Sequence, residues 1–240
     1  MTVKKTALIT GANQGLGFET AKQLAKLGYY VYLGCRNKSK GIAAQETLNA
    51  SGFNDVEFIE IDVTDINSIK SARQVLETKT QQIDVLINNA GIAGEQPQNI
   101  STIDIENLRK LFETNFFGAV QTTQQFIHLL KKSNEPRIVN VSSGLGSLSF
   151  HSSSPDFGMY AAYSCSKTAL NAFTVMLAKE FLGTSFKINS VEPGYTATNL
   201  NQYQGIQTVE EAIGVIIKYA TVGNEGPTGR FFSKEGEFAW

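Results

Sequence analysis

The stretch Thr6–Gly17, TALITGANQGLG, decides how this chain folds. Thr6–Thr10 is a short apolar, β-branched run, which predicts a strand buried on both faces. The TGxxxGxG turn that follows opens a segment with helical spacing. Glycines in such a turn allow the backbone to approach a pyrophosphate held at the helix N-terminus, although an ordinary glycine turn has the same composition. The strand–turn–helix context favours a dinucleotide-binding loop, with expected cofactor contacts at Gly11, Asn13, Gln14, Gly15, Leu16 and Gly17.

The rest of the chain repeats this alternation of short apolar runs and helical periods. Strands are expected at Thr6–Thr10, Tyr30–Gly34, Val56–Ile61, Ile83–Asn88, Arg137–Ser142, Lys187–Val191 and Gly229–Ser233. Helices are expected at Leu16–Leu27, Lys38–Ala50, Asp65–Thr80, Asp104–Lys132, Tyr160–Leu182 and Thr208–Ala220. This order predicts an α/β protein, a doubly wound parallel sheet (Rossmann fold) of about seven strands with helices on both faces. We expect one domain over residues 1–240.

Composition excludes several classes of protein. The 240 residues carry a formal charge of −1, and 42% of them are hydrophobic. A general nucleic-acid binder would need a basic stripe, and a disordered chain would be less apolar. No apolar run is long enough to span a bilayer, and the N-terminus lacks a secretory core, so we expect no membrane partner. Two distant cysteines and two distant histidines (Cys35, Cys165, His128 and His151) predict no disulfide framework and no metal site, and they fit the cytoplasm.

The end of the second strand bears on which nicotinamide cofactor binds. An acidic residue there would bind the ribose 2′-hydroxyl of NAD and repel the 2′-phosphate of NADP. The sequence has Gly34-Cys35-Arg36 instead. Arg36 offers a fork of donors suited to a phosphate, although an arginine at a strand end can simply be solvated. We predict NADP as the cofactor, with NAD less favoured.

Two further strand ends carry candidate cofactor contacts. Asp62-Val63 follows the third strand, where a carboxylate can accept from the adenine amino group; Asp62 could equally be a helix cap. Asn88-Asn89-Ala90-Gly91 ends the fourth strand. Its small residues would leave room for a nucleotide, or could form a structural turn.

The second long helix contains Tyr163 and Lys167 at positions i and i+4, which share one helix face. A phenol has a pKa near 10 and needs help to act as an acid or base at neutral pH. A nearby cation favours the phenolate and so makes the proton easier to release. The pair could also be an ordinary surface pair. Its position beside the Ser-rich segment after the fifth strand favours catalysis.

These motifs, taken in order, resemble the short-chain dehydrogenase/reductase family over nearly the whole chain, in the compact branch with TGxxxGxG and YxxxK. The resemblance implies that Tyr163 is the general acid/base and that Lys167 lowers its pKa and binds the nicotinamide ribose. Ser143 would bind the substrate carbonyl, and Asn115 would hold a water that relays protons to Lys167. Pro193 and Gly194 would form the nicotinamide-side turn, with Thr196 and Thr198 near the carboxamide and phosphates.

The C-terminal segment from Gly226 to Trp240 is similar to the carbonyl-reductase-like subgroup. Gln14 departs from the lysine common there, which removes a second cation near the 2′-phosphate. Ser143 and Tyr163 are 20 positions apart, a spacing between those of the tetrameric and the monomeric members, so the spacing does not decide between a monomer and a homo-oligomer.

Two segments without a core period are expected to form the substrate pocket. They are residues 144–158 and 195–207, each after a strand whose carboxyl end should face the ligand. The expected substrate contacts are Phe150, Phe157, Tyr195 and Tyr203, although such aromatics could instead pack the loops.

The function predicted is an NADP-dependent carbonyl reductase, or ketoreductase, that takes a small-molecule ketone or aldehyde. An NAD-dependent alcohol dehydrogenase using the same site is the alternative. A nucleotide-sensing protein without turnover is disfavoured, because all four catalytic-type residues are present.

Overall fold

The computed structural model describes residues 4–154 and 160–240, and its described strands form one sheet. The strands are β1 (Thr6–Thr10), β2 (Tyr30–Cys35), β3 (Val56–Glu60), β4 (Val85–Asn88), β5 (Arg137–Val141), β6 (Lys187–Val191), β7 (Phe231–Ser233) and β8 (Gly236–Glu237). Their order in the sheet is β3-β2-β1-β4-β5-β6-β7-β8. The pairs from β3 through β7 are parallel, and β8 is antiparallel to β7. The doubly wound parallel sheet predicted from the sequence is confirmed.

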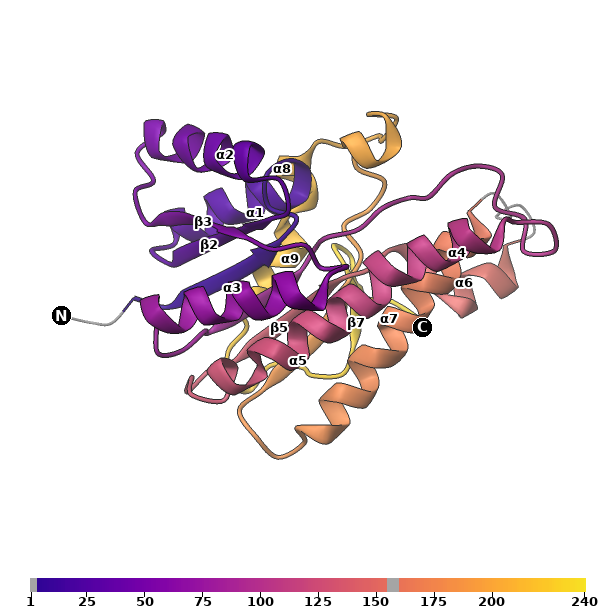
Figure 1. The fold of residues 1–240 in the computed structure, drawn as a ribbon. Coiled ribbons are helices and arrows are strands. Elements are labelled where there is room, and N and C mark those ends of the chain that lie inside the picture. Colours follow the sequence, from indigo (N-terminus) through magenta and orange to yellow (C-terminus); the bar gives the residue numbers. More distant parts are fainter. Residues whose placement is uncertain (1–3, 155–159) are drawn as a thin grey trace.

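Helices connect these strands (Figure 1). They are α1 (Gly15–Lys26), α2 (Lys38–Ala50), α3 (Ile66–Lys79), α4 (Ile105–Phe112), α5 (Gly118–Leu130), α6 (Leu148–Ser153), α7 (Ala161–Glu180), α8 (Val209–Ala212) and α9 (Gly214–Ala220). Short 3-10 turns lie at Gly144–Gly146 and Asn199–Asn201. The chain runs outward from β1 to β3 and then crosses to β4 on the other side of β1. Ligands of such sheets bind at this switch point, beyond the carboxyl ends of the strands.

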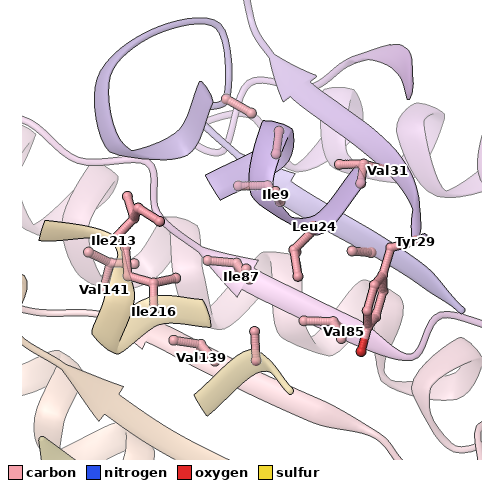
Figure 2. Close-up of a cluster of buried hydrophobic side chains, with 14 of the residues drawn as sticks. Ile9, Leu24, Tyr29, Val31, Val85, Ile87, Val139, Val141, Ile213 and Ile216 are labelled. Carbon is pink, nitrogen blue, oxygen red and sulfur yellow. The ribbon is translucent and has the colours of Figure 1, made fainter. Parts of the chain in front are cut away.

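Alternation along the buried strands fills a core on each face of the sheet. Ile9 of β1 and Ile87 of β4 pack with Leu24 of α1 and Ile216 of α9 (Figure 2). Leu8 and Leu86, one position earlier on the same strands, belong to the opposite core with residues of α3, α5 and α7. Successive side chains of a strand point to opposite faces, which explains the continuous apolar runs of the sequence.

The eight described strands include the seven expected ones and two-residue β8, which is too short to show a period. Two other expectations from the sequence need correction. The helix predicted over Asp104–Lys132 contains a π-helical turn at Glu113–Phe117, which lies between α4 and α5. The segment 144–158, expected to be irregular, contains α6; its first turn is capped by Ser147, whose hydroxyl accepts from Phe150 N at 3.0 Å. Six residues are too few for a helical period to be recognised.

Candidate active site

A cleft of about 770 Å³ lies at the carboxyl ends of the strands. Segments that follow β1, β2, β3, β4, β5 and β6 all contribute to its lining. The cleft brings together most of the residues predicted from the sequence: Gly11, Asn13, Gln14, Gly15, Leu16, Gly17, Arg36, Asp62, Val63, Asn89, Ala90, Gly91, Ser143, Phe150, Tyr163, Lys167, Pro193, Gly194, Tyr195, Thr196 and Thr198.

The glycine turn leaves the N-terminus of α1 open toward the cleft. Gly11 and Gly15 have φ angles of +64° and +57°, which strain any residue with a Cβ. A Cβ on Gly11 would also lie 2.9 Å from Ala90 Cα. Gln14 caps α1 with no side-chain hydrogen bond, so the first helical N–H groups stay available for an anion. These features fit the pyrophosphate of a dinucleotide.

The end of β4 holds this turn in place. The Thr10 hydroxyl accepts from Asn89 N and Ala90 N, both at 3.0 Å. Asn89 Nδ2 donates to Thr10 O at 2.8 Å and to Gly11 O at 3.2 Å. Asn89 and Ala90 therefore link β4 to the glycine turn as well as lining the cleft.

Arg36 and Asp62 lie at the end of the cleft formed by β2 and β3. Arg36 is exposed and makes no hydrogen bond or ion pair with another described residue. Asp62 is not the cap of α3: Asp65 is, and its side chain accepts from Asn67 N at 2.8 Å. The Asp62 carboxylate instead accepts from Thr64 N at 2.9 Å and from the Thr64 hydroxyl at 2.7 Å.

Tyr163, Lys167 and Ser143 meet at the other end of the cleft. Half-buried Tyr163 shares a hydrogen bond with the Ser143 hydroxyl. Lys167 Nζ lies 5.7 Å from the centroid of the Tyr163 ring and donates to Val141 O at 2.8 Å. The helical spacing and the end of β5 thus bring two hydroxyls and an amine to one point.

Burial shifts the pKa values of Tyr163 and Lys167. Burial raises the pKa of Tyr163 to about 12; the carboxylate of Glu192 adds to the rise, and the hydrogen bond from Ser143 opposes it. Burial also lowers the pKa of Lys167 to about 8, because the charged ammonium loses solvent. Burial is the largest cause of the pKa shift at both residues.

Asn115 is buried in the π-helical turn, below the cleft rather than on its surface. Its Oδ1 accepts from Ile92 N at 2.9 Å, and its Nδ2 donates to Ile92 O and to the Ser166 hydroxyl, both at 3.0 Å. Gly91 lies against it, since a Cβ there would be 3.3 Å from Asn115 Oδ1 and 3.5 Å from Lys167 Nζ. Asn115 therefore ties the segment after β4 to the helix that carries Tyr163 and Lys167.

Only some of the predicted substrate residues line the cleft. Phe150 and Tyr195 line the cleft, whereas Tyr203 is 69% exposed and is not among the described lining residues. Phe157 lies outside the described residues. Other aromatic and aliphatic lining residues were not predicted: Leu145, Tyr160, Leu200 and Phe238.

Polar residues of the site were also missed, among them Gln98 and Glu192. Gln98 is 1% exposed; its Oε1 accepts from Tyr163 N at 3.0 Å and its Nε2 donates to Ala93 O at 2.6 Å. Glu192 lines the cleft directly before Pro193. Its position after a strand end, next to the Pro193-Gly194 turn, was a usable signal. Gln98 had none, because it lies in a segment without a period.

The described residues hold no group of three histidine, cysteine or acidic side chains placed to bind a metal ion. Across the same part of the chain, no helix is both long and apolar enough to cross a membrane.

Comparison with known proteins agrees with this geometry. A family model described as short chain dehydrogenase matches residues 5–208. The chain is 31% identical to a (+)-neomenthol dehydrogenase of Capsicum annuum over 98% of its own length and 97% of the relative's. It is 32% identical to a salutaridine reductase of Papaver somniferum over 97% and 95% of the two chains. These alignments span 306 and 299 positions, so both relatives contain residues that this chain lacks.

Solved structures give the same result. The salutaridine reductase of Papaver somniferum superimposes with a TM-score of 0.84 at 30% identity, covering 96% of this chain and 100% of the other. The NADPH-bound carbonyl reductase from chicken fatty liver superimposes with a TM-score of 0.85 at 28% identity, covering 99% of each chain.

The sheet, the cleft and these matches define an oxidoreductase of the class that interconverts alcohols and carbonyl compounds. The chain belongs to the short-chain dehydrogenase/reductase family.

Proposed function

We propose that this protein is an NADPH-dependent carbonyl reductase that acts on ketones or aldehydes. The observation that carries the proposal is the hydrogen-bonded pair of Ser143 and Tyr163, with Lys167 beside it, in a cleft that continues to the glycine turn and Arg36. When bound, the cofactor would supply the hydride. The names of the two relatives and the NADPH-bound carbonyl reductase support the reaction class.

The roles of the chain's own residues follow from their contacts. Ser143 and Tyr163 hydroxyls would donate to the substrate carbonyl oxygen and stabilise the negative charge that develops on it. A tyrosine with a pKa of about 12 is fully protonated at neutral pH, so Tyr163 would deliver the proton to that oxygen. Lys167 would bind the nicotinamide ribose and return a proton to Tyr163, and Asn115 would position the segment after β4 against both.

The remaining cleft residues would hold the dinucleotide. The backbone from Gly11 to Gly17 would bind the pyrophosphate, with Thr198 packed over it, since its methyl lies 3.6 Å from an added Gly15 Cβ. Asp62 and Val63 would contact the adenine, and Asn89, Ala90 and Gly91 the adjoining ribose. Pro193, Gly194 and Thr196 would flank the nicotinamide. Arg36, which has no partner among the described residues, would pair with the 2′-phosphate.

A panel of ketones assayed with NADPH and with NADH tests this proposal. We expect oxidation of NADPH with a higher kcat/KM than that of NADH. Lack of turnover with every ketone and both cofactors would contradict the enzyme assignment, while a preference for NADH would contradict the role of Arg36.

The free thiols of Cys35 and Cys165 support the cytoplasm as the compartment of the protein.

A further inference from the structure

Glu192 places a fixed carboxylate in the cleft beside the catalytic hydroxyls. It follows the last residue of β6, and its main-chain N donates to Phe232 O at 2.8 Å. Its carboxylate accepts from Gly194 N at 2.8 Å and from the backbone N of Gly144, the residue after Ser143. An added Cβ on Gly144 would lie 3.7 Å from Glu192 Oε2. Two backbone donors, one from each neighbouring loop, therefore hold this carboxylate next to Ser143.

The charge of Glu192 has no close counterion. Among the described lining residues, the charged side chains are Arg36, Asp62, Lys167 and Glu192. Arg36 and Asp62 lie at the far end of the cleft. Lys167 is engaged with Val141 O, and no lysine or arginine of the described chain pairs with Glu192 within 4.0 Å. Lys234 and Glu235, which also act on Glu192, have opposite charges and lie on the exposed turn between β7 and β8. The substrate end of the cleft thus holds a carboxylate that is not ion-paired within the described chain, in addition to the Lys167 ammonium.

The walls around this carboxylate are apolar and aromatic. Phe238 Cζ and Glu192 Oε2 each lie 3.7 Å from a Cβ added at Gly144, and Leu145 is the next residue. Phe150 and Tyr195 also line the cleft. Apolar walls exclude water and strengthen the interaction between a fixed charge and a ligand charge. A carboxylate in such surroundings attracts a cationic group and repels an anionic one, which sets specificity by a favourable and an unfavourable contact together.

We propose that Glu192 is a specificity-determining residue that selects apolar carbonyl compounds bearing a positively charged nitrogen, such as amine-containing ketones, and rejects keto acids. The inference rests on the proposed reductase function and assigns its substrate class. Because Glu192 is fixed by backbone groups rather than by a lysine or arginine, its charge is available to a ligand. Burial raises the pKa of its carboxyl, whereas the backbone donors of Gly194 and Gly144 oppose that rise and stabilise the charged form.

The test uses ketones that differ in charge but hardly in shape. One pair is a cyclohexanone with two methyls on the carbon opposite the carbonyl, and the oxopiperidinium cation in which that carbon is a quaternary nitrogen. The second pair is an oxocyclohexane carboxylate and its carboxamide. Values of kcat/KM with NADPH are measured for the natural protein and for Glu192→Gln, and the ratio between the two proteins cancels the intrinsic reactivity of each ketone. Glu235→Gln is the matched control, because it removes a nearby carboxylate that lies outside the cleft.

We expect Glu192→Gln to lower the cation-to-neutral ratio by about tenfold and to raise the anion-to-neutral ratio by a similar factor, while Glu235→Gln leaves both within about twofold. A variant that merely distorts the cleft would not change the cation-to-neutral and anion-to-neutral ratios of kcat/KM in opposite directions. Equal losses for all four ketones, or unchanged ratios, would overturn the proposal. If Glu192→Gln does not fold, Glu192→Ala is measured in the same way. Failure of the natural protein to reduce even the neutral ketones would instead contradict the proposed function.

Discussion

The two ends of the cleft are lined by different kinds of residues. The end formed by β1, β2, β3 and β4 includes the glycine turn and the Asn89-Ala90-Gly91 segment, and hydrogen bonds between Thr10 and Asn89 hold the two together. The end beyond β5 and β6 is lined by large side chains such as Phe150 and Phe238. The first arrangement suits a ligand that is always the same, and the second suits a pocket whose shape depends on a few side chains.

The second end is also assembled from more distant parts of the chain. Ser149 N, in α6, donates to Trp240 O at 2.8 Å, and Phe231 of β7 packs against Phe238 and Trp240 with centroid distances of 5.2 and 5.5 Å. The β7–β8 hairpin therefore supports the wall that α6 contributes. Substitutions at the first end should change cofactor use, and those at the second end should change substrate range.

The largest expected effect lies where the two ends meet. Tyr163→Phe removes the hydroxyl that donates the proton and keeps the ring, so kcat should fall by about 10²–10⁴-fold with little change in NADPH affinity. Tyr160→Phe is the matched control, because Tyr160 also lines the cleft, three residues before Tyr163 at the N-cap of α7, and loss of its hydroxyl should leave kcat within about threefold. Stopped-flow or steady-state rates, with NADPH binding followed by fluorescence, measure both. Near-normal turnover of Tyr163→Phe would remove Tyr163 from the catalytic role.

The contrast between the two ends matches what the sequence could and could not predict. Residues of the first end sit directly after strands, so the strand pattern and the glycine spacing locate Gly11, Asp62 and Asn89 without knowledge of the tertiary structure. Tyr163 and Lys167 are found for a similar reason, since the helical spacing alone puts them on one face.

The residues that escaped prediction depend on contacts between distant segments. Gln98 reaches the site because its amide bridges Ala93 and Tyr163, and Phe238 reaches it through a two-residue strand. Neither produces a period. The π-helical turn around Asn115 is invisible for the same reason, because one inserted turn hardly changes the helical pattern of residues 104–132.

At the cofactor end, Arg36→Asp should reverse the cofactor preference. The change removes a cation suited to the 2′-phosphate and adds a carboxylate that repels it and can accept from a 2′-hydroxyl. We expect the ratio of kcat/KM with NADPH to that with NADH to fall by about 30-fold or more. Lys26→Asp makes the same charge change in the last turn of α1, far from the cleft, and should leave the ratio unchanged. An unaltered ratio in Arg36→Asp would mean that Arg36 is a solvated residue.

The close approach of backbones at the same end gives a smaller expected effect. A Cβ at Gly17 would lie 2.5 Å from Asn89 Nδ2 and 2.6 Å from Gly11 O, so Gly17→Ala must push the glycine turn away from β4. We expect NADPH to bind about tenfold more weakly, with a lower Tm, since overpacking of this kind costs about 1–3 kcal/mol. Gly214→Ala, where an added Cβ meets no atom of another segment within 4 Å, should leave NADPH affinity unchanged and should not lower Tm. Titration of NADPH and thermal denaturation measure both variants, and equal behaviour of the two would show that the turn adapts freely.

The pH dependence of the reduction rate tests the roles of Lys167 and Tyr163, which lie where the two ends of the cleft meet. Lys167, with its pKa lowered to about 8 by burial, keeps its charge only below that pH, whereas Tyr163 stays protonated up to about 12. Reduction should therefore be level through neutral pH and fall by about tenfold per unit above a pH near 8, as one proton is lost from Lys167. In Lys167→Arg the guanidinium does not titrate in this range, so the residual activity should lack that fall. Persistence of the same limb in Lys167→Arg would assign it to another group.

The smallest expected effect distinguishes the aromatics of the substrate end. The sequence pattern gave Phe150 and Tyr203 the same role, but the structure separates them: Phe150 lines the cleft, and Tyr203 is 69% exposed outside it. Phe150→Ala should raise KM about fivefold for bulky aromatic ketones and hardly at all for a ketone of the size of acetone, since one ring contact contributes about 1 kcal/mol. Tyr203→Ala, the matched control, should leave both KM values unchanged. Steady-state kinetics with a graded series of ketones measures this difference. A larger rise in KM for Tyr203→Ala than for Phe150→Ala would place the pocket over the 195–207 segment and not against α6.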